Sequence, residues 1–148
     1  MSTENNTLKL LAERYRLTGK DFFKHPYQGF IIITRTGVEK IMAHDKITVT
    51  YEVVPELTEG QENCCIKATA EKLDANGEVY TVQSYGTANH YNCPVKTKKT
   101  GGSLPHYPVE TAEKRAKARA VLQITGFYSE GVFSEDESDD FKRKWSQP

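Results

Sequence analysis

The chain has 148 residues, and 20 Lys and Arg side chains balance 20 Asp and Glu, so the formal net charge is zero. This length suits one folded domain, and 27% charged with 37% hydrophobic residues is typical of a soluble globular protein. No apolar run approaches the roughly 20 residues of a membrane-spanning helix, and the polar N-terminus lacks a signal-peptide pattern. We therefore expect a cytoplasmic protein with no membrane partner.

The charges are unevenly distributed along the chain despite the neutral total. Bases outnumber acids between residues 96 and 119, whereas every charged residue from 130 to 140 is acidic. The bases of the first segment are Lys96, Lys98, Lys99, Lys114, Arg115, Lys117 and Arg119. A neutral total can thus combine a basic surface with an acidic tail. We expect a folded domain over residues 1–129 and a tail over residues 130–148.

Four elements are predicted in the first half of the chain. Thr7 is placed to cap a helix that ends near Gly19. Residues 30–34 are an aromatic and β-branched run typical of a buried strand, and residues 37–44 follow as a brief helix. Residues 46–54 alternate apolar and polar side chains, which indicates a strand with one buried face.

The second half begins with a hairpin and ends with a long helix. Residues 64–73 and 78–88 flank the sequence Asp-Ala-Asn-Gly, and Asn followed by Gly is a strong hairpin signal. Residues 89–107 are rich in Lys, Thr and Gly, which is typical of a long loop. Residues 109–125 contain strong helix formers, and Gly126 stops this helix.

These elements predict an α+β domain. An antiparallel sheet of three or four strands should have the long C-terminal helix packed across it. Beyond this helix, Ser134 with Glu137 fits a capping box for a last short helix, although the acidity of the segment equally favours disorder.

The long helix has two distinguishable faces. Ala112, Ala116 and Ala120 recur every four residues and form a stripe that can lie close to a sheet. Arg115 and Arg119 are one turn apart and lack an acidic partner at helical spacing, so an anionic ligand between them would remove their repulsion. The alternative interpretation is a solvated helix face.

The loop and the helix together predict a track for a nucleic-acid backbone. Lys96, Lys98 and Lys99 precede the helix, so they can continue its basic side chains, Lys114, Arg115, Lys117 and Arg119, as one stripe that contacts phosphates. Single strands also stack on aromatic rings, for which Tyr85 and Tyr91 are candidates. The alternatives are lysines that keep a loop soluble and tyrosines that pack in the core.

Neither a metal site nor a catalytic motif stands out. The candidate ligands are Cys64, Cys65, His90, Cys93 and His106, and they form no pair of Cys-x-x-Cys units. The chain has no phosphate-binding glycine loop and no nucleophile elbow. Asp21, Asp45, Glu52 and Glu71 could serve a magnesium-dependent nuclease, but their spacing does not single them out. We expect no metal, no cofactor and no enzymatic activity.

Residues 107–141, YPVETAEKRAKARAVLQITGFYSEGVFSEDESDDF, carry a resemblance to a known family. With the hairpin before them they resemble phage and prophage single-strand-binding and annealing proteins, the superfamily of Sak, Erf and the eukaryotic Rad-group annealing protein. The shared order is a hairpin whose second strand ends in Tyr85 and Gly86, an Ala-rich basic helix, and then Gly126 with Phe127. The resemblance covers about the C-terminal half.

The resemblance implies a non-enzymatic function in recombination or replication. Such proteins form rings or filaments, hold single-stranded DNA in a basic groove and need no nucleotide cofactor. It implies backbone contacts for Lys117 and Arg119, and for Arg115 as a weaker case. We therefore expect single-stranded DNA binding, with strand annealing by a homo-oligomer inside a bacterial host cell. The neutral charge and short length depart from the Rad-group pattern.

The acidic tail and the basic stripe leave two further interpretations open. The tail can compete with DNA for the basic groove or dock a protein partner. The whole chain can alternatively be a protein-interaction adaptor of a phage replication or recombination system, whose basic stripe binds an acidic partner.

Overall fold

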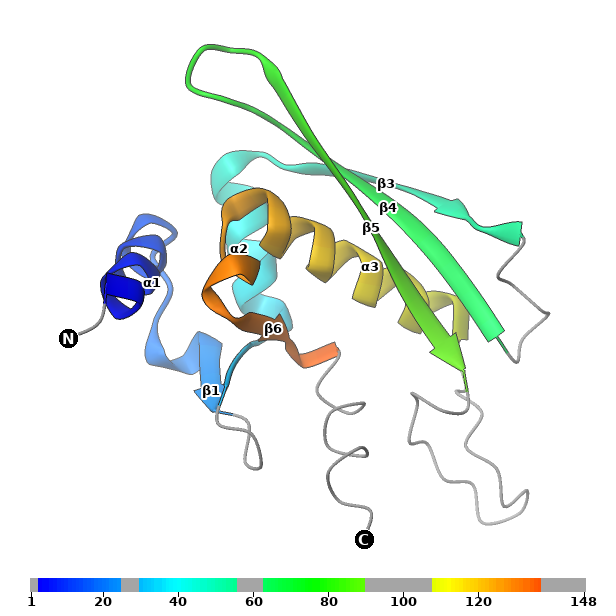
Figure 1. The fold of residues 1–148 in the computed structure, drawn as a ribbon, viewed down its shortest axis with the longest axis horizontal. Coiled ribbons are helices and arrows are strands. Elements are labelled where there is room, and N and C mark those ends of the chain that lie inside the picture. The colour runs from blue at the N-terminus through cyan, green and yellow to red at the C-terminus, as the bar shows by residue number, and fades with distance from the viewer. Residues whose placement is uncertain (1–2, 25–29, 56–62, 90–107, 137–148) are drawn as a thin grey trace, which may run out of the picture.

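The computed structural model describes residues 3–24, 30–55, 63–89 and 108–136. Within these ranges the chain forms three α-helices and two three-stranded sheets, shown in Figure 1. The strand order is β3-β4-β5 in the larger sheet and β1-β2-β6 in the smaller one.

The larger sheet is antiparallel and contains the predicted hairpin. Its strands are β3 (Thr48–Val53), β4 (Asn63–Leu73) and β5 (Val79–Asn89). In the turn between β4 and β5, the Asp74 carboxylate accepts hydrogen bonds from the backbone N–H groups of Asn76 and Glu78, and Gly77 adopts a φ of 80°. The Asn-Gly signal succeeds because glycine takes this left-handed conformation without steric cost.

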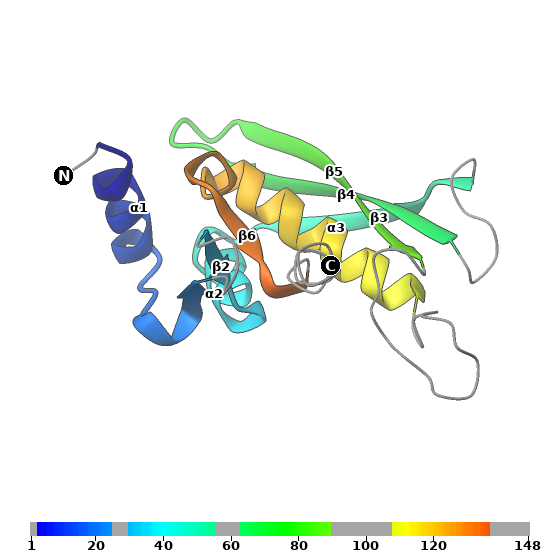
Figure 2. The ribbon, with the colours of Figure 1, turned by 60° about the horizontal axis from the view of Figure 1, so that its bottom comes forward.

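Helix α3 (Pro108–Thr125) packs across one face of the larger sheet, and none of the described helices or strands covers the opposite face (Figure 2). Ala112, Ala116 and Ala120 are fully buried, as their four-residue spacing predicts. The predicted architecture of an antiparallel sheet with the long C-terminal helix across it is confirmed, with three strands in that sheet.

The N-terminal segment differs from its prediction at the helix start. Helix α1 (Thr3–Arg14) begins before Thr7, so Thr7 lies inside the helix, where threonine has only a modest propensity cost. Thr18 instead forms a capping box with Asp21 at the 3-10 helix η1 (Gly19–Asp21), and strand β1 (Phe22–Lys24) follows.

The predicted strand near residues 30–34 belongs to the smaller sheet. Strand β2 (Ile31–Ile33) pairs antiparallel with β1 and parallel with β6 (Val132–Ser134), and helix α2 (Arg35–Asp45) follows β2. The 3-10 helix η3 (Tyr128–Glu130) leads into β6. Strand β6 therefore lies within residues 130–148, the segment that the charge pattern assigns to the tail.

The apolar core lies between α3 and the surrounding elements. Among its fully buried side chains are Ile33, Ile41, Val121, Leu122 and Phe127. None of the helices in the described ranges is long and apolar enough to cross a membrane.

Candidate nucleic-acid interface

The contact between α3 and β5 decides which helix residues can reach a ligand. A Cβ atom on Gly86 would overlap the carbonyl oxygen of Ala112 and the backbone nitrogen of Ala116. The helix backbone therefore lies directly on the strand, as close as a glycine permits. Because the alanine stripe faces the sheet, the basic side chains of α3 lie on its flanks and on its far side.

Arg115 is a structural cross-link. Its side chain is buried, with a residue exposure of 5%, and its Nε donates a hydrogen bond of 2.9 Å to the Asp136 carbonyl oxygen. Its NH1 group donates a second bond of 2.9 Å to the Thr87 carbonyl oxygen. Arg115 thus joins α3 to β5 and to the residues after β6. Charge spacing along the helix does not reveal these partners, because both acceptors are backbone carbonyl groups.

A groove lies between α2 and α3 where charged side chains of both helices meet, and we call it the α2–α3 groove. Its volume is about 190 Å³. Its lining residues are Arg35, Val38, Glu39, Lys114, Lys117, Ala118 and Asp136. It brings together Lys114 and Lys117, two of the predicted contacts, and adds Arg35, which the sequence did not indicate.

The two acidic side chains that directly follow β6, Glu135 and Asp136, contact Arg35 of this groove. Arg35 Nε donates a hydrogen bond of 2.7 Å to Asp136 Oδ1, and the Asp136 side chain is only 9% exposed. The backbone N–H of Arg35 donates to Glu135 Oε1 at 2.8 Å. Because Arg35 is the first residue of α2, both carboxylates also benefit from the positive end of the helix dipole. Two carboxylates of the chain itself therefore contact the first residue of α2.

A carboxylate, that of Glu39, also lines the groove on its α2 side. Lys117 Nζ donates to Glu39 Oε1 at 2.6 Å, in an ion pair that joins α3 to α2. Burial and the negative charges of Glu113 and Glu39 raise the pKa of Tyr51 to about 12. The positive character is therefore concentrated near Arg35 and Lys114, and it decreases toward Tyr51.

Tyr85 does not lie beside the basic helix. Gly86 faces α3, so its neighbour Tyr85 points to the uncovered face of the sheet, where its residue exposure is 47%. Its cross-strand partner there is Lys67, which pairs with Glu52 at 2.9 Å. The larger sheet therefore separates Tyr85 from the α2–α3 groove.

The remaining predicted contacts divide between two groups. Arg119 lies one turn after Arg115 on α3 and is partly exposed. The loop candidates Lys96, Lys98, Lys99 and Tyr91 lie outside the described residues.

Three of the four carboxylates considered for a nuclease are engaged in separate ion pairs. Asp21 accepts a hydrogen bond from Lys40, Asp45 accepts one from Lys72, and Glu52 pairs with Lys67. Within the described ranges, no three His, Cys, Asp or Glu side chains gather as a metal-ligand set. Cys64 and Cys65 are buried, and burial raises the pKa of the Cys65 thiol.

No family model matches the chain, and no curated protein or solved structure matches it either. The resemblance to annealing proteins therefore stays a prediction, and what the α2–α3 groove can bind is inferred from its own side chains.

Proposed function

We propose that the protein binds single-stranded DNA without catalysing a reaction, and that the sugar–phosphate backbone lies in the α2–α3 groove. The contact between Arg35 and Asp136 carries this proposal, because an anionic group already lies among the cations of the groove. Phosphate oxygens accept the same charge-assisted hydrogen bonds as a carboxylate, so a nucleotide phosphate can replace Asp136.

Charge balance supports the exchange of a carboxylate for a phosphate. The groove lining contains three cations, Arg35, Lys114 and Lys117, together with the carboxylates of Glu39 and Asp136. When Asp136 leaves, three cations face the single carboxylate of Glu39. Glu135 and Asp136 then act as competitors of DNA, which is the first of the two roles expected for the acidic tail.

Backbone contacts of this kind favour a role in strand annealing. Contacts to phosphates position a strand but carry no sequence information. A strand held by its backbone keeps its base edges available for pairing with a complement. The proposed activity is therefore annealing in recombination or replication, with binding that is independent of base sequence.

The direct test replaces Lys114 and Lys117 with glutamine. Fluorescence anisotropy of a labelled single-stranded oligonucleotide, titrated at several salt concentrations, should show weaker binding by Lys114→Gln with Lys117→Gln. The log-log salt slope should become shallower by about 0.7 for each lysine that contacts a phosphate. Arg115 is a poor choice for this test, because its removal would also break the cross-link to Thr87 and Asp136.

The matched control for each single variant, Lys114→Gln or Lys117→Gln, is Lys46→Gln, which removes one charge at the opposite end of α2 from Arg35. Lys46 lies eleven residues after Arg35, which is about 16 Å along the helix axis. This distance exceeds the Debye length of about 8–10 Å at moderate salt, so the charge of Lys46 is screened from the groove. Lys46→Gln should bind like the wild type. Wild-type protein that does not bind the oligonucleotide even at low salt would refute the proposal.

The reciprocal test concerns the competing carboxylates. Glu135→Gln with Asp136→Asn should tighten DNA binding, and the Asp136 carbonyl that Arg115 contacts is preserved. Glu13→Gln with Glu71→Gln changes the net charge equally at exposed positions on α1 and β4, so it serves as the control. Equal affinities for the two double variants would mean that net charge, and not competition in the groove, governs binding.

The same carboxylate contacts also support the adaptor as a second candidate function. An acidic segment of another protein could occupy the groove as Glu135 and Asp136 do. An adaptor would bind an acidic peptide in competition with its own carboxylates and would have no salt-dependent affinity for the oligonucleotide. Anisotropy with a labelled acidic peptide, run beside the DNA titration, distinguishes the two functions.

A further inference from the structure

The turn of the β4–β5 hairpin carries exposed apolar side chains, and we call residues 73–79 the hairpin tip. Leu73 and Val79 are paired directly across the hairpin and are 65% and 64% exposed. Strand β3 ends its pairing with β4 at Glu71, so the tip extends beyond the three-stranded part of the sheet (Figure 1). At this exposure the two aliphatic side chains remain mostly outside the core formed by the described residues.

The hairpin tip is also acidic and well ordered in its hydrogen bonding. Asp74 and Glu78 flank the turn and are exposed. The Asp74 carboxylate accepts two backbone hydrogen bonds within the turn, from Asn76 and Glu78. The tip therefore presents a preformed apolar surface with two carboxylates beside it, and little further ordering is needed when it binds.

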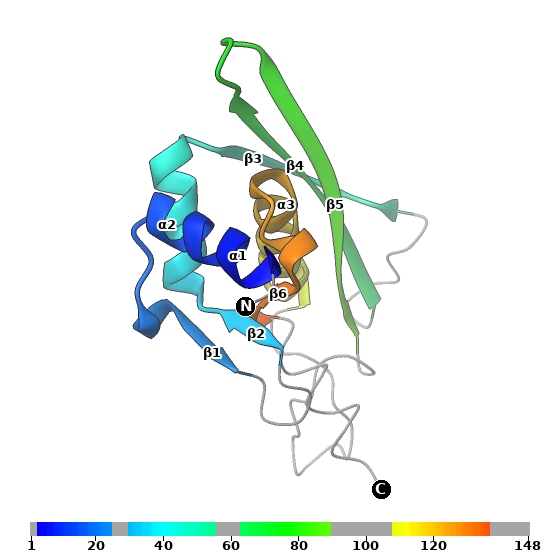
Figure 3. The ribbon, with the colours of Figure 1, turned by 60° about the vertical axis from the view of Figure 1, so that its left-hand side comes forward.

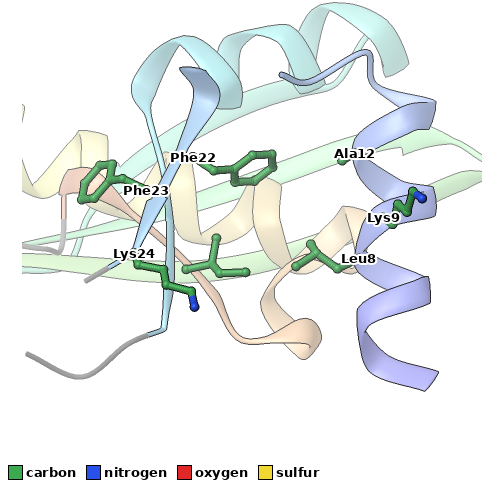
Figure 4. Close-up of a pocket in the computed structure, with 7 residues that line it drawn as sticks. Leu8, Lys9, Ala12, Phe22, Phe23 and Lys24 are labelled. Atoms are coloured by element: carbon green, nitrogen blue, oxygen red, sulfur yellow. The ribbon is translucent and has the colours of Figure 1, made fainter. Parts of the chain in front are cut away.

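A second apolar surface lies at another part of the molecule, between α1 and β1, and we call it the α1–β1 groove. Its volume is about 370 Å³, enough for a pair of aliphatic side chains. Figure 4 shows Leu8 and Phe22 extending toward each other across it. Its lining residues are Leu8, Lys9, Ala12, Phe22, Phe23, Lys24 and Ile31. The groove is thus apolar inside and carries two lysines.

We propose that the hairpin tip of one copy binds in the α1–β1 groove of a second copy. Leu73 and Val79 would fill the apolar groove, and Asp74 and Glu78 would face its two lysines. Within one chain the two surfaces lie apart in both Figure 1 and Figure 3, so they can meet only between copies. The apolar character of both surfaces and their opposite charges identify the partner as another copy of this chain.

The proposed contact is head-to-tail, because the two surfaces that meet are different. A contact of this kind propagates from copy to copy and gives a closed ring or an open filament. Each interface is small, so a single contact should be weak, and assembly should depend on protein concentration. The contact uses no residue of the α2–α3 groove, so it is independent of DNA binding.

The first experiment measures assembly without DNA by sedimentation velocity over a wide range of protein concentrations. Wild-type protein should form species larger than a dimer, and Leu73→Thr with Val79→Thr should remain monomeric. Val53→Thr with Val109→Thr removes two aliphatic side chains of similar exposure, 49% and 44%, away from the tip and serves as the control. Circular dichroism checks that each variant is folded.

The second experiment tests the pairing of tip and groove by complementation. Lys9→Glu with Lys24→Glu should impair the groove while leaving the tip intact. Mixing this variant with the Leu73→Thr, Val79→Thr variant should give dimers and nothing larger, because only one intact tip can meet one intact groove. In a single chain, Glu78→Lys should weaken assembly and an added Lys24→Glu should restore it.

Three results would overturn the proposal. Wild-type protein could stay monomeric at every concentration, which would leave the groove for a different partner. The tip variant could assemble like the wild type. The mixed variants could form no dimers. None of these results depends on whether the protein binds DNA.

Discussion

Asp45, the last residue of α2, joins three parts of the fold through one carboxylate. Its Oδ2 accepts hydrogen bonds from the Tyr15 hydroxyl at 2.6 Å and from Lys72 Nζ at 3.1 Å, and His44 Nδ1 lies 2.9 Å from Oδ1. Burial by itself would raise the pKa of Asp45, but the hydrogen bonds from Tyr15, His44 and Lys72 outweigh it and lower the pKa. Burial and the bond to Asp45 raise the pKa of Tyr15.

Replacing Asp45 with asparagine should therefore destabilise the protein in a pH-dependent way. A carboxyl whose pKa is lowered on folding contributes stability above its unfolded pKa of about 3.9, and this contribution is lost as the pH falls through the folded pKa. We expect Asp45→Asn to lower the free energy of unfolding by about 1–3 kcal/mol at neutral pH. In urea unfolding the difference from wild type should shrink near pH 3. A difference of equal size at both pH values would contradict this account.

Gly86 controls how closely α3 approaches β5. Because a Cβ at this position would meet the backbone of Ala112 and Ala116, no side-chain rotation can relieve the overlap. Gly86→Ala should cost about 3 kcal/mol of stability, at the upper end for overpacking, as measured by urea unfolding. Gly19→Ala is the comparison, because a Cβ there meets no atom within 4 Å. Equal stability of the two variants would mean that α3 can shift away from the sheet.

Strand β6 makes the start of the acidic segment part of the folded domain. Val132 and Ser134 are buried at 0% and 1% exposure, and Val132 is paired in parallel with Ile31 of β2. The Phe133 ring packs against the rings of Phe30 and Tyr128, with centroid distances of 4.9 and 5.5 Å. The two residues after β6 then contact Arg35 and Arg115.

Two truncated chains distinguish the contribution of this segment to stability from the effect of its charge on DNA binding. A chain that ends after Ser129 lacks β6 and the acceptor of Arg115 on Asp136, so its thermal midpoint should fall well below that of a chain that ends after Asp136. A change in DNA binding by the shorter chain would then reflect two effects, the loss of folded structure and the loss of the carboxylates that compete with DNA. Similar midpoints for the two truncated chains, measured by circular dichroism, would show that β6 contributes little to stability.

At the scale of the whole molecule, the proposed DNA track and the proposed self-association surfaces use different side chains. The α2–α3 groove depends on Arg35, Lys114 and Lys117, whereas assembly depends on the hairpin tip and the α1–β1 groove. A head-to-tail assembly would repeat the α2–α3 groove once in every copy. Repeated backbone contacts along one strand would raise the affinity for long single strands over short ones, since a strand held by one copy is presented to the next copy at a high effective concentration.

Local patterns in the sequence determined the larger sheet and its helix. The Asn-Gly pair before Glu78 located the hairpin, the alternation over residues 46–54 located β3, and the alanines of α3 identified its buried face. Each of these signals involves neighbours a few residues apart, so the chain expresses it without reference to the rest of the fold. In the smaller sheet, the aromatic and β-branched run over residues 30–34 located β2, whereas β1 and β6 were missed because three residues are too few to establish a period.

Only the tertiary structure decided which charged groups meet. Arg115 was expected to face a ligand, but it donates to carbonyl groups that lie 28 and 21 residues away, on Thr87 and Asp136. No pattern in the sequence predicted that Arg35 lines the groove, because its carboxylate partner Asp136 is 101 residues distant. Periodicity along an element reports which face is buried, whereas the pairing of charges depends on how elements pack against one another. That packing brought Lys114 and Lys117 beside Arg35 and left Tyr85 on the far side of the sheet.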